Sequence, residues 1–208
     1  MLFHPTYFSP IIQYIAMYHS DVLVFETQDN FEKQTYRNRC KIAGPNGIQN
    51  LTIPIIKNSG VKTPTKDILI DYKENWQTNH FRSIKTAYQS SPFFEFYEDD
   101  IRPLYENEIK YLLDFNIQCH EVFSKALDLK LNFNKTDEYN TEVVHDFRKL
   151  VNAKKEPDYK LKPYVQVFDD KYGFTPNLSI LDLLFNEGPN TEIYLLDNKI
   201  ELENLSQK

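Results

Sequence analysis

Short apolar runs alternate with turn-forming residues through the N-terminal third of the chain, which predicts alternating strands and helices. Residues 2–7 are expected to form a short strand or entry loop. Ser9 and Pro10 have the residue types of a helix N-cap and first helical position, so a helix is predicted from Pro10 to Tyr18. The stretch Asp21–Glu26 is an apolar run between two acidic residues, which is typical of a strand buried on both faces in a parallel or mixed sheet.

The turn formers Gly44-Pro45-Asn46-Gly47 separate two further runs with strand character. Tyr36 to Ala43 and Ile48 to Ile56 are therefore predicted to be the strands of a β-hairpin. A third short strand is expected at residues 68–70. These strands and the predicted helices together favour an α/β fold.

Helical periodicity dominates the centre of the chain. Asn75 is expected to cap a helix from Trp76 to about Tyr88, whose apolar residues form one stripe with His80. Residues 93–105 predict a helical passage interrupted at Pro103, and residues 108–127 predict a long amphipathic helix.

The C-terminal third of the chain mixes a polar segment with one more helix. Residues 132–163 are rich in Lys, Asn, Asp and Glu and are expected to be a surface excursion or insertion. Ser179 and Asp182 resemble a capping box for a helix that ends at Gly188, and residues 201–208 are expected to be a frayed tail. The prediction is one domain over residues 1–208, with a mixed sheet, a β-hairpin and flanking helices.

Composition narrows the function. The 208 residues include 15 Phe, 14 Tyr and 1 Trp but only 5 Gly. The glycines complete neither a dinucleotide-binding motif nor a P-loop, and the nucleophile elbow of serine hydrolases is absent. Aromatic side chains would then be the main core material, although codon bias alone could also produce their excess.

Several other classes of protein are not expected. Cys40 and Cys119 lie far apart in the sequence with no ligand spacing around them, so we predict neither a disulfide, a metal site nor a cofactor. No run approaches the about 18 apolar residues of a membrane span. The first residues lack the pattern of a signal peptide, and a cytoplasmic protein is expected.

Charge is unevenly distributed. The whole chain carries −6, yet residues 1–66 carry +3, which indicates a local anion site more than a nucleic-acid-binding surface. In an extended chain Arg37, Arg39 and Lys41 would share one face, and arginine side chains suit phosphate or carboxylate oxygens. Tyr36 and Asn38 would share the other face. The alternative is a solvated strand face.

Two histidines are candidates for chemistry. His80 lies on the aromatic stripe of its predicted helix, where partial burial would favour the neutral imidazole needed by a general base. His4, within Phe3-His4-Pro5-Thr6-Tyr7, could contact substrate at a strand end. In each case the alternative is a structural residue, packed in the core or placed in a turn.

In this order along the chain, several stretches resemble the WbqC-like protein family. They are His4–Tyr7, Asp21–Phe25, Gln34–Arg39, Leu51–Ile55, Trp76 with His80, Ser91–Phe94 and Asn177–Gly188. Many members begin with Gln-Pro-x-Tyr, whereas this chain has His4 at the Gln position.

The resemblance implies a role in bacterial O-antigen or other surface-polysaccharide biosynthesis, with transfer of an aminoacyl group, such as glycyl, to an amino sugar. The acceptor would be nucleotide-linked or lipid-linked, and the amino acid would arrive already activated. In that role His80 would be the general base, and Arg37 and Arg39 would bind an anion. The remaining substrate-binding candidates are Tyr36, Asn38, Trp76, His4 and Tyr7. The alternative is a non-catalytic protein that binds a nucleotide sugar or a partner enzyme.

Overall fold

Three parallel strands from distant parts of the chain form one sheet. The computed structural model describes residues 1–56, 62–155 and 159–198. Strands β1 (Leu2–Phe3), β2 (Leu23–Phe25) and β7 (Phe133–Lys135) lie in the order β1-β2-β7. The middle strand confirms the predicted buried strand, because it is paired on both sides and buries Leu23 and Phe25.

The predicted hairpin is present with shorter strands. β3 (Arg39–Gly44) and β4 (Gly47–Thr52) are antiparallel, and Gly44 pairs with Gly47 around a two-residue turn. Gly47 has a φ of 102°, which residues other than glycine rarely adopt. The second strand ends early because β5 (Ile55–Ile56) pairs with β6 (Leu69–Ile70) in a separate sheet.

The prediction that the first hairpin strand starts at Tyr36 is wrong. The backbone of Tyr36 bonds Tyr7 and Val151 instead of a hairpin partner, so residues 36–37 form a turn. Arg37 therefore does not share a strand face with Arg39, and the expected row of three cations is not formed. Hydrogen bonds between distant parts of the chain cause this difference, and they leave no signal in the local sequence.

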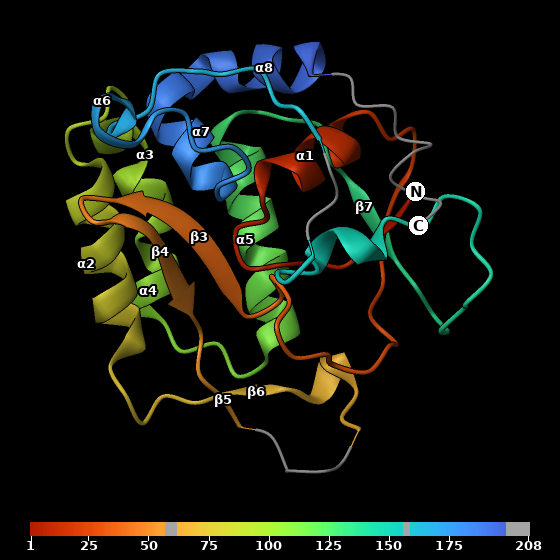
Figure 1. Ribbon diagram of the computed structural model, residues 1–208. Coiled ribbons are helices and arrows are strands. Elements are labelled where there is room, and N and C mark those ends of the chain that lie inside the picture. The colour runs from red at the N-terminus through yellow and green to blue at the C-terminus, as the bar shows by residue number, and fades with distance from the viewer. Residues whose placement is uncertain (57–61, 156–158, 199–208) are drawn as a thin grey trace.

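Helices lie around the β3–β4 hairpin on several sides (Figure 1). The α-helices are α1 (Ile11–Tyr18), α2 (Trp76–Tyr88), α3 (Phe94–Ile101), α4 (Pro103–Glu106), α5 (Leu112–Ala126), α6 (Asp169–Tyr172), α7 (Ile180–Glu187) and α8 (Thr191–Asp197). Single 3₁₀ turns occur as η1 (Thr65–Asp67), η2 (Arg148–Val151) and η3 (Gly188–Asn190). Within the described ranges, no helix combines the length and the apolar character that a bilayer crossing needs.

The predicted helix signals are partly confirmed. Helix α2 has the predicted bounds, and Pro103 separates α3 from α4. The Ser179 hydroxyl accepts a hydrogen bond from the Leu181 amide and caps α7, whereas the Asn75 side chain makes no capping bond to α2. Burial of apolar faces therefore positions α2 without a side-chain cap.

The polar segment 132–163 contains both exposed loop and core residues. Residues 137–145 are mostly exposed, whereas β7 completes the parallel sheet, and Phe147 is buried in a stack on Phe3 at 5.2 Å between ring centroids. The backbone of Leu2 bonds His145 and Phe147, which ties this segment to β1. The expected frayed tail at 201–208 lies outside the described residues.

Candidate functional site

Polar side chains follow the carboxyl end of each parallel strand. His4 comes directly after β1, Glu26 directly after β2 and Thr136 directly after β7. The Thr136 hydroxyl donates to Glu26 Oε1 at 2.8 Å, so two of these ends are joined by a side-chain hydrogen bond. Because open α/β sheets place ligand-binding groups beyond the carboxyl ends of their strands, this edge is the candidate functional site.

Arg37 is the most heavily bonded cation at this edge. Its guanidinium pairs with Asp29 at 2.8 Å and donates to the Thr65 hydroxyl at 3.0 Å and to the Asn30 carbonyl at 3.1 Å. Only 2% of Arg37 is exposed. Burial lowers the pKa of Arg37 and raises that of Asp29, and the attraction between the two charges opposes both shifts. Arg37 is thus already neutralised by a carboxylate of its own chain.

His4 is held neutral by the guanidinium of Arg37. Arg37 donates to His4 Nε2 at 2.8 Å, which makes that ring nitrogen an acceptor and leaves the proton on Nδ1. Burial is the main cause that holds the pKa of His4 well below its ordinary value, with further lowering by the charges of Arg37 and Arg148. The Gln13 side chain donates to the His4 carbonyl at 2.7 Å and fixes the backbone beside the ring.

A second buried ion pair lies beside the first. Arg148 Nη1 donates to Glu26 Oε2 at 3.0 Å, and its other nitrogens hold Asp146 in a two-bond arrangement at 2.9 and 2.6 Å. Burial opposes ionisation of Asp146, but the hydrogen bonds from Arg148 outweigh it and lower its pKa. The ring of Tyr139 lies 5.1 Å from the Arg148 guanidinium. This pair joins the polar segment to β2.

Tyr7 is the middle member of a chain of hydrogen bonds that joins Tyr105 to His80. The Tyr7 hydroxyl lies 3.1 Å from His80 Nδ1 and 2.7 Å from the Tyr105 hydroxyl. Burial lowers the pKa of His80 to about 4, and a hydrogen bond to the Thr52 backbone opposes this. A bond to a backbone carbonyl requires an N–H, and Nδ1 faces Tyr7, so the proton belongs on Nε2. Tyr7 then donates to Nδ1 and accepts from Tyr105.

Trp76 packs against this chain on the same helix as His80. The two ring centroids are 5.1 Å apart in an edge-on arrangement, and Trp76 is only 3% exposed. Its indole Nε1 is buried without a hydrogen bond inside residues 1–56, 62–155 and 159–198. Trp76 is therefore placed to shape the surroundings of His80.

The remaining predicted residues lie between or beside these groups. Tyr36 is buried with Lys41 5.6 Å from its ring, and the Asn38 amide donates to the Ile53 carbonyl at 3.0 Å. Arg39 is half-buried, and its Nε finds no hydrogen-bond partner in the described part of the chain. Of the two arginines predicted to bind an anion, Arg39 is the one for which the described residues provide no carboxylate partner.

One buried amide connects the two groups. Asn116 on α5 donates to the Pro5 carbonyl at 3.2 Å and to the Arg37 carbonyl at 2.8 Å. The segment from His4 to Tyr7 thus begins with a residue that contacts Arg37 and ends with a residue that contacts His80. Helix α5 fixes the position of this segment through Asn116. The structure brings together His4 with Arg37, and Tyr7 with His80 and Trp76, but Arg39 belongs to neither group.

Sequence reasoning missed the acidic partners of these cations. Glu26 ends the predicted buried-strand stretch and Asp29 follows three residues later, which is a signal that could have pointed to the edge of the sheet. Arg148 and Tyr105 had no such signal, because they meet their partners only through tertiary contacts. Over the described ranges, no group of three or more His, Cys, Asp or Glu side chains is arranged to hold a metal ion.

Comparison with known proteins places these residues in a wider group. The chain is 26% identical over 205 residues to the uncharacterised protein Rv1507c of Mycobacterium tuberculosis strain H37Rv, a similarity that covers 84% of this chain and 87% of that protein. No solved structure matches the chain. A family model matches residues 5–156, a range that holds both arginine pairs and the Tyr105–Tyr7–His80 chain. Because this match spans well over half of the sequence, the chain belongs to the WbqC-like protein family.

Proposed function

We propose that this protein acts in the cytoplasm in the biosynthesis of bacterial surface polysaccharides of the O-antigen type. Its reaction is transfer of an aminoacyl group, with glycyl as the first candidate, to the amine of a nucleotide-linked or lipid-linked amino sugar. Family membership supports the pathway. The observation that carries the chemistry is the hydrogen-bond chain from Tyr105 through Tyr7 to the neutral imidazole of His80.

In this reaction the sugar amine attacks the acyl carbon of the activated amino acid. A C–N bond forms, the bond from the acyl carbon to its activating group breaks, and the amine must lose a proton. Tyr7 is fully buried, whereas Tyr105 and His80 are each 7% exposed. The accepting nitrogen of His80 faces Tyr7, so the proton would enter at Tyr105. Each hydroxyl would pass one proton inward, and Nδ1 of His80 would take up the last one until the leaving group receives it.

The anionic part of the donor or acceptor would bind Arg39. Arg37 already pairs with Asp29, so a ligand would have to compete with a buried carboxylate for it. Arg39 is half-buried, and its buried Nε has no hydrogen-bond partner among the described residues, so a phosphate or carboxylate oxygen would pair with the exposed part of this side chain. Trp76, Tyr36 and Asn38 would then hold the structure around the bound substrate.

A non-catalytic role in the same pathway is the second candidate, and the low basicity of His80 favours it. Protonating a group of pKa about 4 at pH 7 costs about 4 kcal/mol, at 1.36 kcal/mol for each of three pKa units. A protein that only binds a nucleotide sugar would need no such proton acceptor. The same residues would then serve packing and ligand recognition.

An assay with purified protein, amino-sugar nucleotides and activated glycine separates these candidates. We expect His80→Gln and Tyr7→Phe each to lower kcat about a hundredfold, and Arg39→Ala to raise KM about tenfold. Arg82→Ala, an exposed cation on the same helix as His80, is the matched control and should leave both constants unchanged.

Equal turnover of the parent and the three site variants would show that the transferase assignment is wrong. A rise in melting temperature with the sugar nucleotide and no product would instead support the binding protein. Circular dichroism of each variant establishes that it is folded before its activity is compared.

A further inference from the structure

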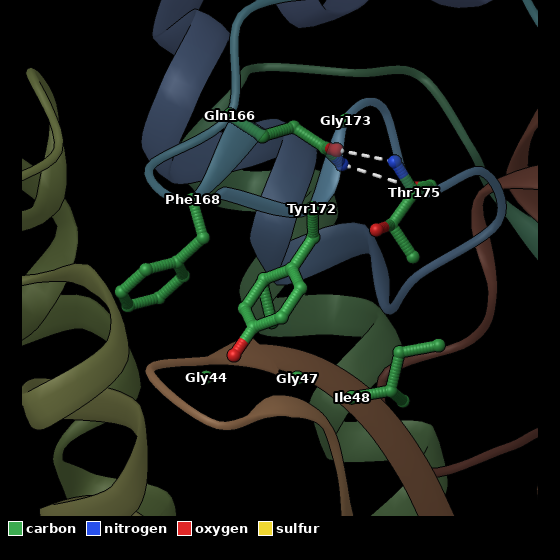
Figure 2. Close-up of a pocket in the computed structure, with 9 residues that line it drawn as sticks. Gly44, Gly47, Ile48, Gln166, Phe168, Tyr172, Gly173 and Thr175 are labelled. Atoms are coloured by element: carbon green, nitrogen blue, oxygen red, sulfur yellow. Dashed lines mark hydrogen bonds between the residues drawn. The ribbon is translucent and has the colours of Figure 1, made fainter. Parts of the chain in front are cut away.

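A cavity of about 220 Å³ lies between the tip of the β3–β4 hairpin and residues 166–175 (Figure 2). None of the predicted site residues lines it. Two hydrogen bonds to one carbonyl hold its walls together: Lys171 Nζ donates to the Pro45 carbonyl at 2.8 Å, and the Tyr172 hydroxyl donates to it at 3.0 Å. The hairpin turn is thus fastened to α6, and the space between them is preformed.

Gln166 holds the loop of the cavity in place. Its Oε1 accepts from the Thr175 amide at 2.8 Å, and its Nε2 donates to the Thr175 carbonyl at 3.0 Å, as Figure 2 shows. The same Nε2 lies 2.8 Å from Oδ2 of Asp182, a fully buried carboxylate on α7. The amide of Gln166 is therefore fixed from both sides, and a ligand would meet a rigid wall.

The chemistry of the lining is apolar with a small polar part. Phe168, Tyr172 and Ile48 project their side chains around the space in Figure 2, and its lining includes no charged side chain from the described residues. The Thr175 hydroxyl is directed toward the same space. Gly173 adds accessible backbone, because a Cβ built there would meet no atom within 4 Å.

We propose that this cavity binds one uncharged sugar ring. Its volume is below the about 300–1,000 Å³ of pockets that take drug-sized ligands, so it suits a single ring and not a whole nucleotide sugar. An apolar C–H face of a pyranose packs on aromatic rings while its hydroxyls need a hydroxyl or backbone partner, which is the combination found here. The choice of a sugar over other uncharged rings rests on the proposed function.

Titration of ¹⁵N-labelled full-length protein with methyl α-glucoside and with N-acetylglucosamine tests this assignment. The amide signals of Gly47, Gly173 and Thr175 report on the cavity directly. We expect both sugars to shift these signals with a Kd of roughly millimolar size, as for other ligands of one ring. Uracil, an uncharged ring that is not a sugar, should leave them unchanged.

Three variants locate the ligand. Tyr172→Ala should weaken sugar binding about fivefold, whereas Tyr172→Phe keeps the ring and should stay within about twofold of the parent. Thr175→Val keeps the shape, removes the hydroxyl and should weaken binding about threefold. Phe96→Ala removes an aromatic ring that is 72% exposed on α3, and this matched control should bind as the parent does.

Other outcomes overturn the assignment. Unshifted amides at about 20 mM sugar, equal binding by Tyr172→Ala and the parent, or a response to uracil alone would each do so. Sugar binding at this cavity in a protein without transferase activity would count against the proposed enzyme and leave the cavity assignment standing. Transfer activity without sugar shifts at the three amides would overturn the cavity assignment alone.

Discussion

Burial separates two arginines that are only two positions apart. Arg37 is 2% exposed and is enclosed by Asp29, Thr65 and the His4 ring. Arg39 is half-buried, and its Nε has no hydrogen-bond partner among the residues that the structure describes. Removing one partner of a buried ion pair destabilises the fold, because the other charge is left in the interior without compensation. At the residue scale we therefore expect Arg37 to stabilise the fold, and Arg39 is the candidate for ligand binding.

The first prediction compares these two residues. Arg37→Ala leaves Asp29 buried without its cation and should lower the free energy of unfolding by about 3–5 kcal/mol. Arg39→Ala removes no ion pair within the described part of the chain and should lower it by less than about 1 kcal/mol. Urea denaturation followed by circular dichroism measures both. Similar losses for the two variants would contradict this division of roles.

The second prediction concerns acid and the buried histidines. Burial lowers the pKa of both His80 and His120 to about 4, below the ordinary 6.5. Between these values the unfolded chain binds more protons than the folded one, so stability should be full above pH 6.5 and fall as the pH drops toward 4. Each histidine contributes about 3 kcal/mol to this fall, at 1.36 kcal/mol per pKa unit.

Unfolding in urea at pH 4.5 and at pH 7 measures this loss. His120→Gln removes one titrating group and should lose less stability between the two pH values than the parent. His145→Gln, at an exposed position, is the matched control and should lose as much as the parent. A pH dependence that does not change in His120→Gln would contradict the assignment.

At the scale of elements, the parallel sheet depends on the polar segment 132–163, whose composition predicts a surface loop. Two of its strands have only two and three residues, too few to be stable alone. The polar segment supplies β7 on one side of β2 and backbone bonds to Leu2 on the other side of β1. A small number of apolar residues in this segment therefore make most of its contacts with the core.

The third prediction follows from that packing. Phe147 is 1% exposed and stacked on Phe3, so Phe147→Ala should lower the free energy of unfolding by about 3–5 kcal/mol. Val144 lies three residues earlier and is 85% exposed, and Val144→Ala should change it by less than about 0.5 kcal/mol. Thermal unfolding of both variants measures the contrast. A small loss for Phe147→Ala would show that the segment is dispensable for the core.

At the scale of the whole molecule, the fold extends beyond the range of the family match. That match ends at residue 156, yet α7 lies in the core and buries Leu184 and Phe185 completely. Helix α1 contacts both α7 and α8, so the C-terminal helices pack on the first helix of the chain. Residues 159–198 are therefore part of the same core.

The fourth prediction tests this with a truncation and two point variants. A chain ending at residue 158 should show no cooperative unfolding transition, because it would expose the apolar surface that α7 covers. Leu184→Ala should lower the free energy of unfolding by about 2–5 kcal/mol. Leu196→Ala on α8, at a position 48% exposed, should change it by less than about 1 kcal/mol. A truncated chain that unfolds cooperatively would refute the prediction.

By itself the sequence determined the local structure. Charges flanking an apolar run predicted the buried strand β2, turn formers predicted the hairpin, and the break at Pro103 and the bounds of α2 followed from residue spacing. These features depend on neighbours within a few positions, where the backbone geometry of a strand, turn or helix fixes which residues share a face. An α/β fold could be predicted from them.

Only the tertiary structure decided what the polar residues do. Arg148 pairs with Glu26 across 122 positions, and Tyr7 meets His80 across 73. Contacts of this kind leave no periodic pattern in one sequence, because they form where separate elements meet. The same contacts turn Arg37 into a buried structural cation, lower the pKa of His80 and place the cavity beside the hairpin, away from the residues with the strongest sequence signal.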